Sequence, residues 1–130
     1  MMKMKPIRLI FQENCYDPDI MGVKFKERLK VEESGVCAYE IYQRKENGKF
    51  ERISYKKNII SLHDVFDFFE EVEKFIEKST LGGMIVDDCS AYVKLKYPGM
   101  EVVAERELID ENNRYLECII LDFIEKNFGK

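Results

Sequence analysis

The order of apolar patterns along the chain predicts an α+β fold. Apolar and polar residues alternate in residues 23–31, 36–43 and 50–56, which is typical of half-buried strands. A 3.6-residue apolar period, typical of amphipathic helices, follows at residues 62–79 and again at 111–127. We therefore expect an antiparallel sheet of about five to six strands with two helices packed on one face, in the order (β)βββ-α-ββ-α, as a single domain spanning residues 1–130.

The first half of the chain is expected to form a meander of strands. A short apolar segment at residues 7–11 is a candidate first strand, and the Asp-Pro sequence within residues 14–19 is typical of a turn. Asn47-Gly48 is a strong hairpin signal between the two strands that flank it. In the strand after this hairpin, the alternation places Ile53 and Tyr55 toward the core.

The second half begins with a helix-start signal. Ser61 and Asp64 have the spacing of an N-cap and the third residue of a helix, and Gly82-Gly83 is expected to end that helix. Two strands, residues 91–97 and 100–105, then lead to the second helix. The side chains expected in the core are Val23, Phe25, Leu29, Tyr39, Ile41, Ile53, Phe66, Phe69, Val72, Ile120 and Phe123.

Catalytic, metal and cofactor chemistry have little support in the sequence. The four cysteines are widely spaced without a Cys-x-x-Cys motif, so we expect four reduced thiols and no metal or other cofactor. His63 is the single histidine, and although Asp67 lies four residues later, both fall on the polar face of the helix. We therefore expect His63 to face solvent and the protein not to be an enzyme.

Location and self-association follow from the apolar segments. No apolar run approaches the ~20 residues of a membrane span, and the N-terminal segment lacks the core of a signal peptide, so we expect a cytoplasmic protein with no membrane partner. Leu121 and Phe128 lie away from the main apolar stripe of the second helix. Exposed apolar residues there would suit a homodimer contact.

The charge distribution suggests a partner. The net charge is −4, but residues 1–60 carry a net +4 and residues 61–130 a net −8. An acidic helix surface would steer a basic protein toward it, so we expect a small non-catalytic binding protein, of which an immunity protein that neutralises a toxin such as a basic nuclease fits best. The candidate partner-binding residues are Asp64, Asp67, Glu70, Glu71 and Glu77.

Two alternatives remain open. The first is a nucleic-acid-binding module that uses a basic sheet face, since cations interleaved with aromatic rings suit single-stranded nucleic acid. The second is a small-ligand-binding protein or an enzyme with a pocket that no motif reveals. The residues of the basic face would be Lys24, Lys26, Arg28, Lys30, Arg52 and Lys56, with Tyr42 and Phe50 among them.

Overall fold

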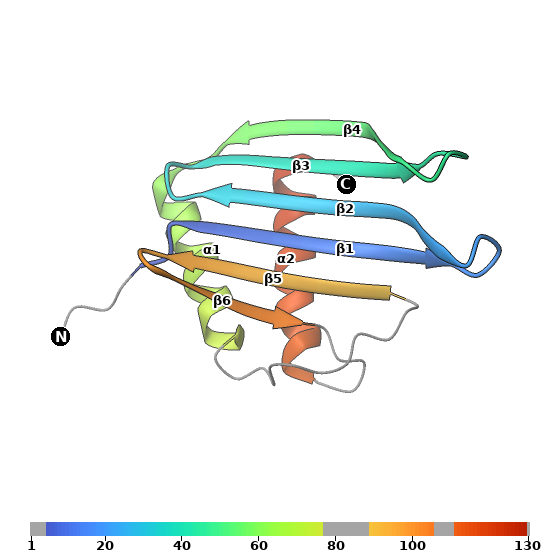
Figure 1. Ribbon diagram of the computed structural model, residues 1–130. Helices are drawn as coiled ribbons and strands as arrows, with labels where there is room; N and C mark the ends of the chain where they lie inside the picture. Colours follow the sequence, from blue (N-terminus) through green and yellow to red (C-terminus); the bar gives the residue numbers. More distant parts are fainter. Residues whose placement is uncertain (1–4, 77–88, 106–110, 130) are drawn as a thin grey trace.

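A computed structural model describes residues 5–76, 89–105 and 111–129. All neighbouring strands are antiparallel, in the sheet order β4-β3-β2-β1-β5-β6. Both helices lie on one side of this sheet (Figure 1), which confirms the predicted α+β architecture. The elements are β1 (Arg8–Asp17), β2 (Gly22–Glu32), β3 (Val36–Arg44), β4 (Phe50–Ile59), α1 (Leu62–Ile76), β5 (Cys89–Tyr97), β6 (Met100–Glu105) and α2 (Glu111–Phe128).

The first strand is longer than the sequence predicted. β1 pairs with β2 on one side and with β5 on the other, and its ladder with β2 continues to the pair Asp17 and Gly22. Much of the expected turn at residues 14–19 is therefore strand. The turn begins after Asp17, whose Oδ1 accepts a hydrogen bond of 2.9 Å from the Asp19 backbone N–H. Pairing on both sides extends β1, a tertiary effect that local turn residues do not report.

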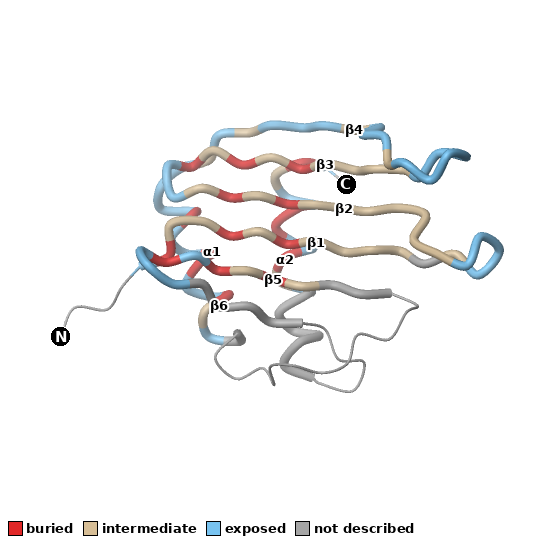
Figure 2. The backbone as a smooth tube through the Cα atoms, in the orientation of Figure 1, coloured by how far each residue is buried: buried red, intermediate tan, exposed pale blue. Residues whose placement is uncertain are grey.

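The core lies between the sheet and the two helices, and the buried positions alternate along β1, β2, β3 and β5 (Figure 2). The larger part of the expected core is confirmed, while three of its members, Val23, Phe25 and Ile41, are half-buried. The confirmed residues are Leu29, Tyr39, Phe69, Val72, Ile120 and Phe123.

β4 carries the first error of the sequence prediction. Ile53 and Tyr55 are 50% and 49% exposed, not buried. A bulge in the β3–β4 ladder is the reason, because Ile41 pairs with Ser54 whereas Tyr42 pairs with Arg52, which leaves Ile53 as the extra residue. One extra residue exchanges the faces of the strand beyond it, so Tyr55 turns away from the helices.

The face of α1 that is buried also differs from the prediction. Phe66, expected in the core, is 42% exposed, whereas Phe68 is 6% exposed. The rings of Phe68 and Phe123 stack with centroids 4.0 Å apart, so α2 lies against the Phe68 side of α1. The apolar arc of α1 is wide enough to allow either rotation, and the position of α2 decides which part is covered.

Two polar side chains make defined contacts at α1. Ser61 Oγ accepts a hydrogen bond of 3.1 Å from the Asp64 backbone N–H, which confirms the predicted N-cap. Glu73 lies on the apolar side of the helix, half-buried, and its Oε2 accepts a hydrogen bond of 3.0 Å from the Tyr97 hydroxyl on β5. This bond satisfies a carboxylate at the edge of the core.

The last turn of α2 packs against β3 and β4. Phe128, expected to be exposed, is 8% exposed, and its ring centroid lies 5.7 Å from that of Tyr39. Lys56 Nζ donates to the Phe128 carbonyl and Asn58 Nδ2 to the Asn127 carbonyl, both at 3.0 Å. Leu121 is 37% exposed, so of the two residues named for a homodimer contact it is the one at the surface.

Candidate functional site

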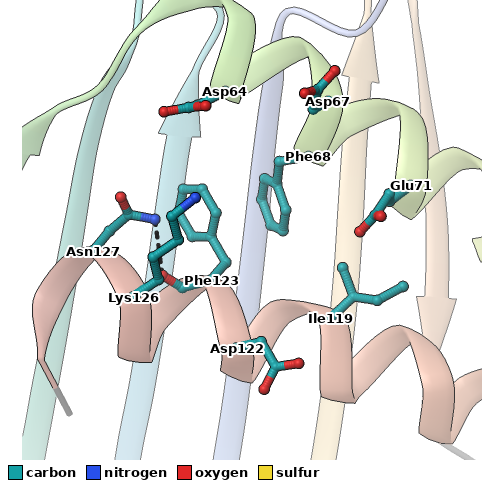
Figure 3. Close-up of a pocket in the computed structure, with 9 residues that line it drawn as sticks. All are labelled: Asp64, Asp67, Phe68, Glu71, Ile119, Asp122, Phe123, Lys126 and Asn127. Atoms are coloured by element: carbon teal, nitrogen blue, oxygen red, sulfur yellow. Dashed lines mark hydrogen bonds between the residues drawn. The ribbon is translucent and has the colours of Figure 1, made fainter.

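A groove runs between α1 and α2 on the side away from the sheet, and Figure 3 shows it from the solvent side. Its volume is about 230 Å³. Both helices contribute side chains to it, and the N-terminal part of α1 faces the C-terminal part of α2. The lining residues are Asp64, Asp67, Phe68, Glu71, Ile119, Asp122, Phe123, Lys126 and Asn127.

The floor of the groove is aromatic. Phe68 from α1 and Phe123 from α2 stack face to face, with an angle of 18° between the ring planes. Half-buried Ile119 extends this apolar surface along α2. Asn127 Nδ2 donates a hydrogen bond of 2.9 Å to the Phe123 carbonyl, which holds the amide against its own helix. The floor is therefore a packed surface that joins the two helices.

The rim of the groove is acidic. Asp64, Asp67 and Glu71 recur at three- and four-residue intervals, so they lie along one face of α1. Asp122 adds a carboxylate from α2, while Lys126 supplies a positive charge near one end. Four carboxylates against one ammonium group give this groove a net negative charge. The arrangement suits a cationic group whose apolar part can rest on the aromatic floor.

The structure brings together only part of the residue set that the sequence named. Asp64, Asp67 and Glu71 line the groove. Glu70 is exposed on α1 but does not line the groove, and Glu77 lies outside the described residues. The aromatic floor was missed because Phe68 and Phe123 have the periodicity of ordinary core residues. Only the meeting of the two helices turns them into the base of a groove.

His63 faces solvent, as predicted. Its Nε2 lies 3.1 Å from Asp67 Oδ2, and the two side chains are 83% and 62% exposed. Within the described residues, no group of three or more His, Cys, Asp and Glu side chains is arranged to hold a metal ion. The His63–Asp67 pair therefore lies at the outer rim of the groove as an exposed i,i+4 contact.

The opposite face of the sheet forms a second surface, which no described helix covers (Figure 1). Residues that pair directly in an antiparallel ladder lie on the same face of the sheet. Buried Leu9, Leu29 and Tyr39, with their partners, therefore lie on the face that the helices cover. The residues that alternate with them along each strand lie on the open face. Glu32 and Glu40 are the acids on this face among side chains that the structure describes. Its basic residues are Arg8, Lys26, Arg28, Lys30, Arg44, Arg52, Lys57, Lys94 and Lys96.

The bulge in the β3–β4 ladder changes the membership of this open face. The prediction that Lys56 lies on this face is wrong. Lys56 pairs with Tyr39, and its Nζ reaches the end of α2 on the helix side. Its neighbours Tyr55 and Lys57 take the outward positions instead. Lys24 lies beside an irregularity in the β1–β2 ladder, where its Nζ is 3.6 Å from Asp17 Oδ2.

A polar network lies on the part of the open face that β3 and β4 form. The Tyr42 hydroxyl donates to Glu40 Oε2, and Arg52 Nη1 lies 3.4 Å from the same oxygen. The hydrogen bond to Glu40 raises the pKa of Tyr42, and burial adds to that rise. Arg28 pairs with Glu40 in the ladder, yet its buried Nε has no hydrogen-bond partner among the described residues. Glu40 therefore neutralises only part of the surrounding positive charge.

The sequence also led to predictions about the state of the cysteines and about membrane-spanning helices. Cys15, Cys37 and Cys118 are in the thiol form, while the Cys89 side chain lies outside the described residues. Neither α1 nor α2, as far as the structure describes them, has the length and hydropathy that a bilayer-spanning helix needs.

Sequence similarity does not assign a function to this chain. No known protein-family model matches the chain, and no curated protein is significantly similar to it.

Proposed function

We propose that this protein binds a basic protein partner in the acidic groove between α1 and α2. The observation that carries the proposal is the convergence of Asp64, Asp67 and Glu71 from α1 with Asp122 from α2 around the stacked Phe68 and Phe123 rings. Within this class, an immunity protein that neutralises a toxin such as a basic nuclease is the specific function that we favour.

The chemistry of the groove suits a lysine or arginine side chain of the partner. Such a side chain has an apolar stem, which can cover Phe68 and Phe123, and a cationic head, which can reach the carboxylates of the rim. A single small metal ion would need oxygen ligands at about 2–2.6 Å, and the described residues offer no such cluster.

The charge of the second half of the chain supports fast capture of that partner. Residues 61–130, which include both helices, carry a net −8, and the groove acids lie on the exposed side of those helices. Opposite charges steer association, and exposed charges are screened over a Debye length of about 10 Å at 0.1 M salt. The association rate should therefore fall as salt rises, with a smaller change in the dissociation rate.

The direct test uses the protein encoded beside this chain if that neighbour is basic. If this chain is the immunity protein of a toxic neighbour, expression of the neighbour alone should arrest growth. Co-expression of this chain should then restore growth. Binding kinetics of the two purified proteins then give the association rate at several salt concentrations. Failure of co-expression to restore growth, with a neighbour shown to be toxic, contradicts the immunity assignment.

Two adjacent glutamates on α1 provide a matched pair of variants. Glu71→Lys reverses a charge in the groove, whereas Glu70→Lys makes the same change on the same helix outside the groove. We expect Glu71→Lys to slow association about tenfold or more, and Glu70→Lys to slow it much less. Both side chains are exposed, so both variants should unfold near the wild-type midpoint. Equal slowing by the two variants would contradict the groove as the binding site.

A further inference from the structure

The open face of the sheet combines charge and aromatic rings in a way that the groove does not explain. Its described basic residues extend from β4 across β3, β2 and β1 to β5. These five strands are about 4.8 Å apart, so the basic surface is roughly 19 Å wide. Two carboxylates, Glu32 and Glu40, offset a minority of this charge within the described side chains.

Four aromatic side chains lie among these cations. Lys26 Nζ is 4.1 Å from the Phe50 ring centroid, and the Arg52 guanidinium carbon is 4.5 Å from that of Tyr55. Lys94 Nζ lies 5.2 Å from the Tyr92 ring centroid at the other side of the face. Tyr42 lies between these groups, next to Arg52 in the ladder. The rings and the positive charges are therefore interleaved across the sheet.

The rings distinguish between the polyanions that such a face could bind. Aromatic side chains also occur at protein interfaces, but an acidic protein surface does not present the successive planar groups on which a row of rings can stack. Single-stranded nucleic acid uses both, because its phosphates pair with Lys and Arg while its bases stack on aromatic rings. Tyr55 is 49% exposed, so much of its ring is accessible to a base. A sheet face that no described helix covers also allows an extended nucleic-acid strand to cross several neighbouring β-strands.

We propose that the open face of the sheet binds single-stranded nucleic acid, independently of the partner in the helix groove. Lys26, Arg28 and Lys94 contact phosphates, and Tyr55 stacks on a base. Arg28 is half-buried on the same face of β2 as Lys26 and Lys30, so its guanidinium adds to the positive charge that a phosphate meets there. The overall net charge is −4, but the first half of the chain is positive. The positive charge near the open face, and not the overall charge, therefore governs this binding.

The experiment measures fluorescence anisotropy of a labelled single-stranded oligonucleotide of about 12 nucleotides, within the usual range of site sizes. The full-length protein should bind it saturably at about 50 mM salt, with an affinity that falls linearly on a log–log plot as salt rises. The double variant Lys26→Glu/Lys94→Glu should make the slope of log affinity against log salt less steep. The slope should change by about 0.7 for each phosphate contact that is lost. A matched double reversal on the helix side, Lys5→Glu with Lys74→Glu, should retain the wild-type slope.

Base stacking is tested separately from charge. Tyr55→Ala should weaken binding about fivefold or more, while Tyr55→Phe keeps the ring and should bind like the wild type. Tyr55 is half-exposed, so both variants should fold, as a circular dichroism melt will check. Glu71→Lys in the groove should not weaken oligonucleotide binding, so this proposal can fail or succeed independently of the groove.

Three results would overturn the proposal. The first is the absence of saturable oligonucleotide binding at low salt. The second is an equal loss of affinity in the sheet-face and helix-side double reversals, which would indicate a general charge effect. The third is wild-type affinity in Tyr55→Ala together with equally tight binding of a polyanion without bases, such as heparin. That last result would identify the face as a site that binds polyanions through charge alone, without recognising bases.

Discussion

The rings of Phe68 and Phe123 stack with their centroids 4.0 Å apart, and this contact joins α1 to α2 at the floor of the groove. Phe68→Ala should lower the free energy of unfolding by about 3–5 kcal/mol, because it leaves a cavity between the helices. Phe66, two residues earlier, is 42% exposed, so Phe66→Ala should cost less than about 1.5 kcal/mol. Denaturant unfolding followed by circular dichroism compares the two variants, and similar losses would contradict the observed rotation of α1.

Gly35 is expected to resist substitution more than other glycines with positive φ. Its φ is +96°, and a Cβ at this position would overlap the Ile60 carbonyl oxygen. Gly48 has a φ of +85°, but the nearest atom to its Cβ would be Arg44 Nη2 at 3.7 Å. Gly48→Ala should therefore cost about 1–2 kcal/mol of stability, and Gly35→Ala about 3 kcal/mol or more. Both variants carry the strain of a positive φ, but only Gly35→Ala adds the steric overlap. The difference between the melting temperatures of the two variants therefore reports the effect of the overlap.

Cys37 and Cys118 should differ strongly in thiol reactivity. Burial raises the pKa of the Cys37 thiol, and the thiolate is the reactive form, whereas Cys118 is exposed on α2. In the native protein at pH 8, a thiol reagent should label Cys118 rapidly and Cys37 slowly, as peptide mapping by mass spectrometry can show. In denaturant without a reductant, all four cysteines should react. Rapid native labelling of Cys37 would contradict its burial.

Tyr42 should ionise at an unusually high pH. Its hydrogen bond to the Glu40 carboxylate raises the pKa of Tyr42, because ionisation would place two negative charges side by side. Glu40→Gln should lower that pKa toward the usual value of about 10, as an absorbance titration against Tyr42→Phe can measure. Since the folded protein holds this proton more tightly, its stabilising contribution is complete below about pH 10 and is lost as pH rises through the folded-state pKa. Tyr42→Phe should therefore remove part of the alkaline loss of stability.

Local sequence patterns correctly predicted those structural features that depend only on residues close together in the chain. The alternation around Leu29 places that residue in the core and Lys26, Arg28 and Lys30 on the other face, because strand geometry fixes a period of two. Ser61 caps α1 through a bond between residues three apart.

Tertiary contacts decided the features that depend on how elements meet. The bulge at Ile53 arises from pairing with β3, and it reverses the face of Tyr55 that alternation predicts. The wide apolar arc of α1 fits two rotations, and contact with Phe123 selects the one that buries Phe68 and exposes Phe66. The acids of α1 are visible as a periodic pattern, but their groove exists only because α2 brings Asp122 and Phe123 beside them. Sequence periodicity reports one element at a time, whereas a site formed by two elements depends on their relative placement.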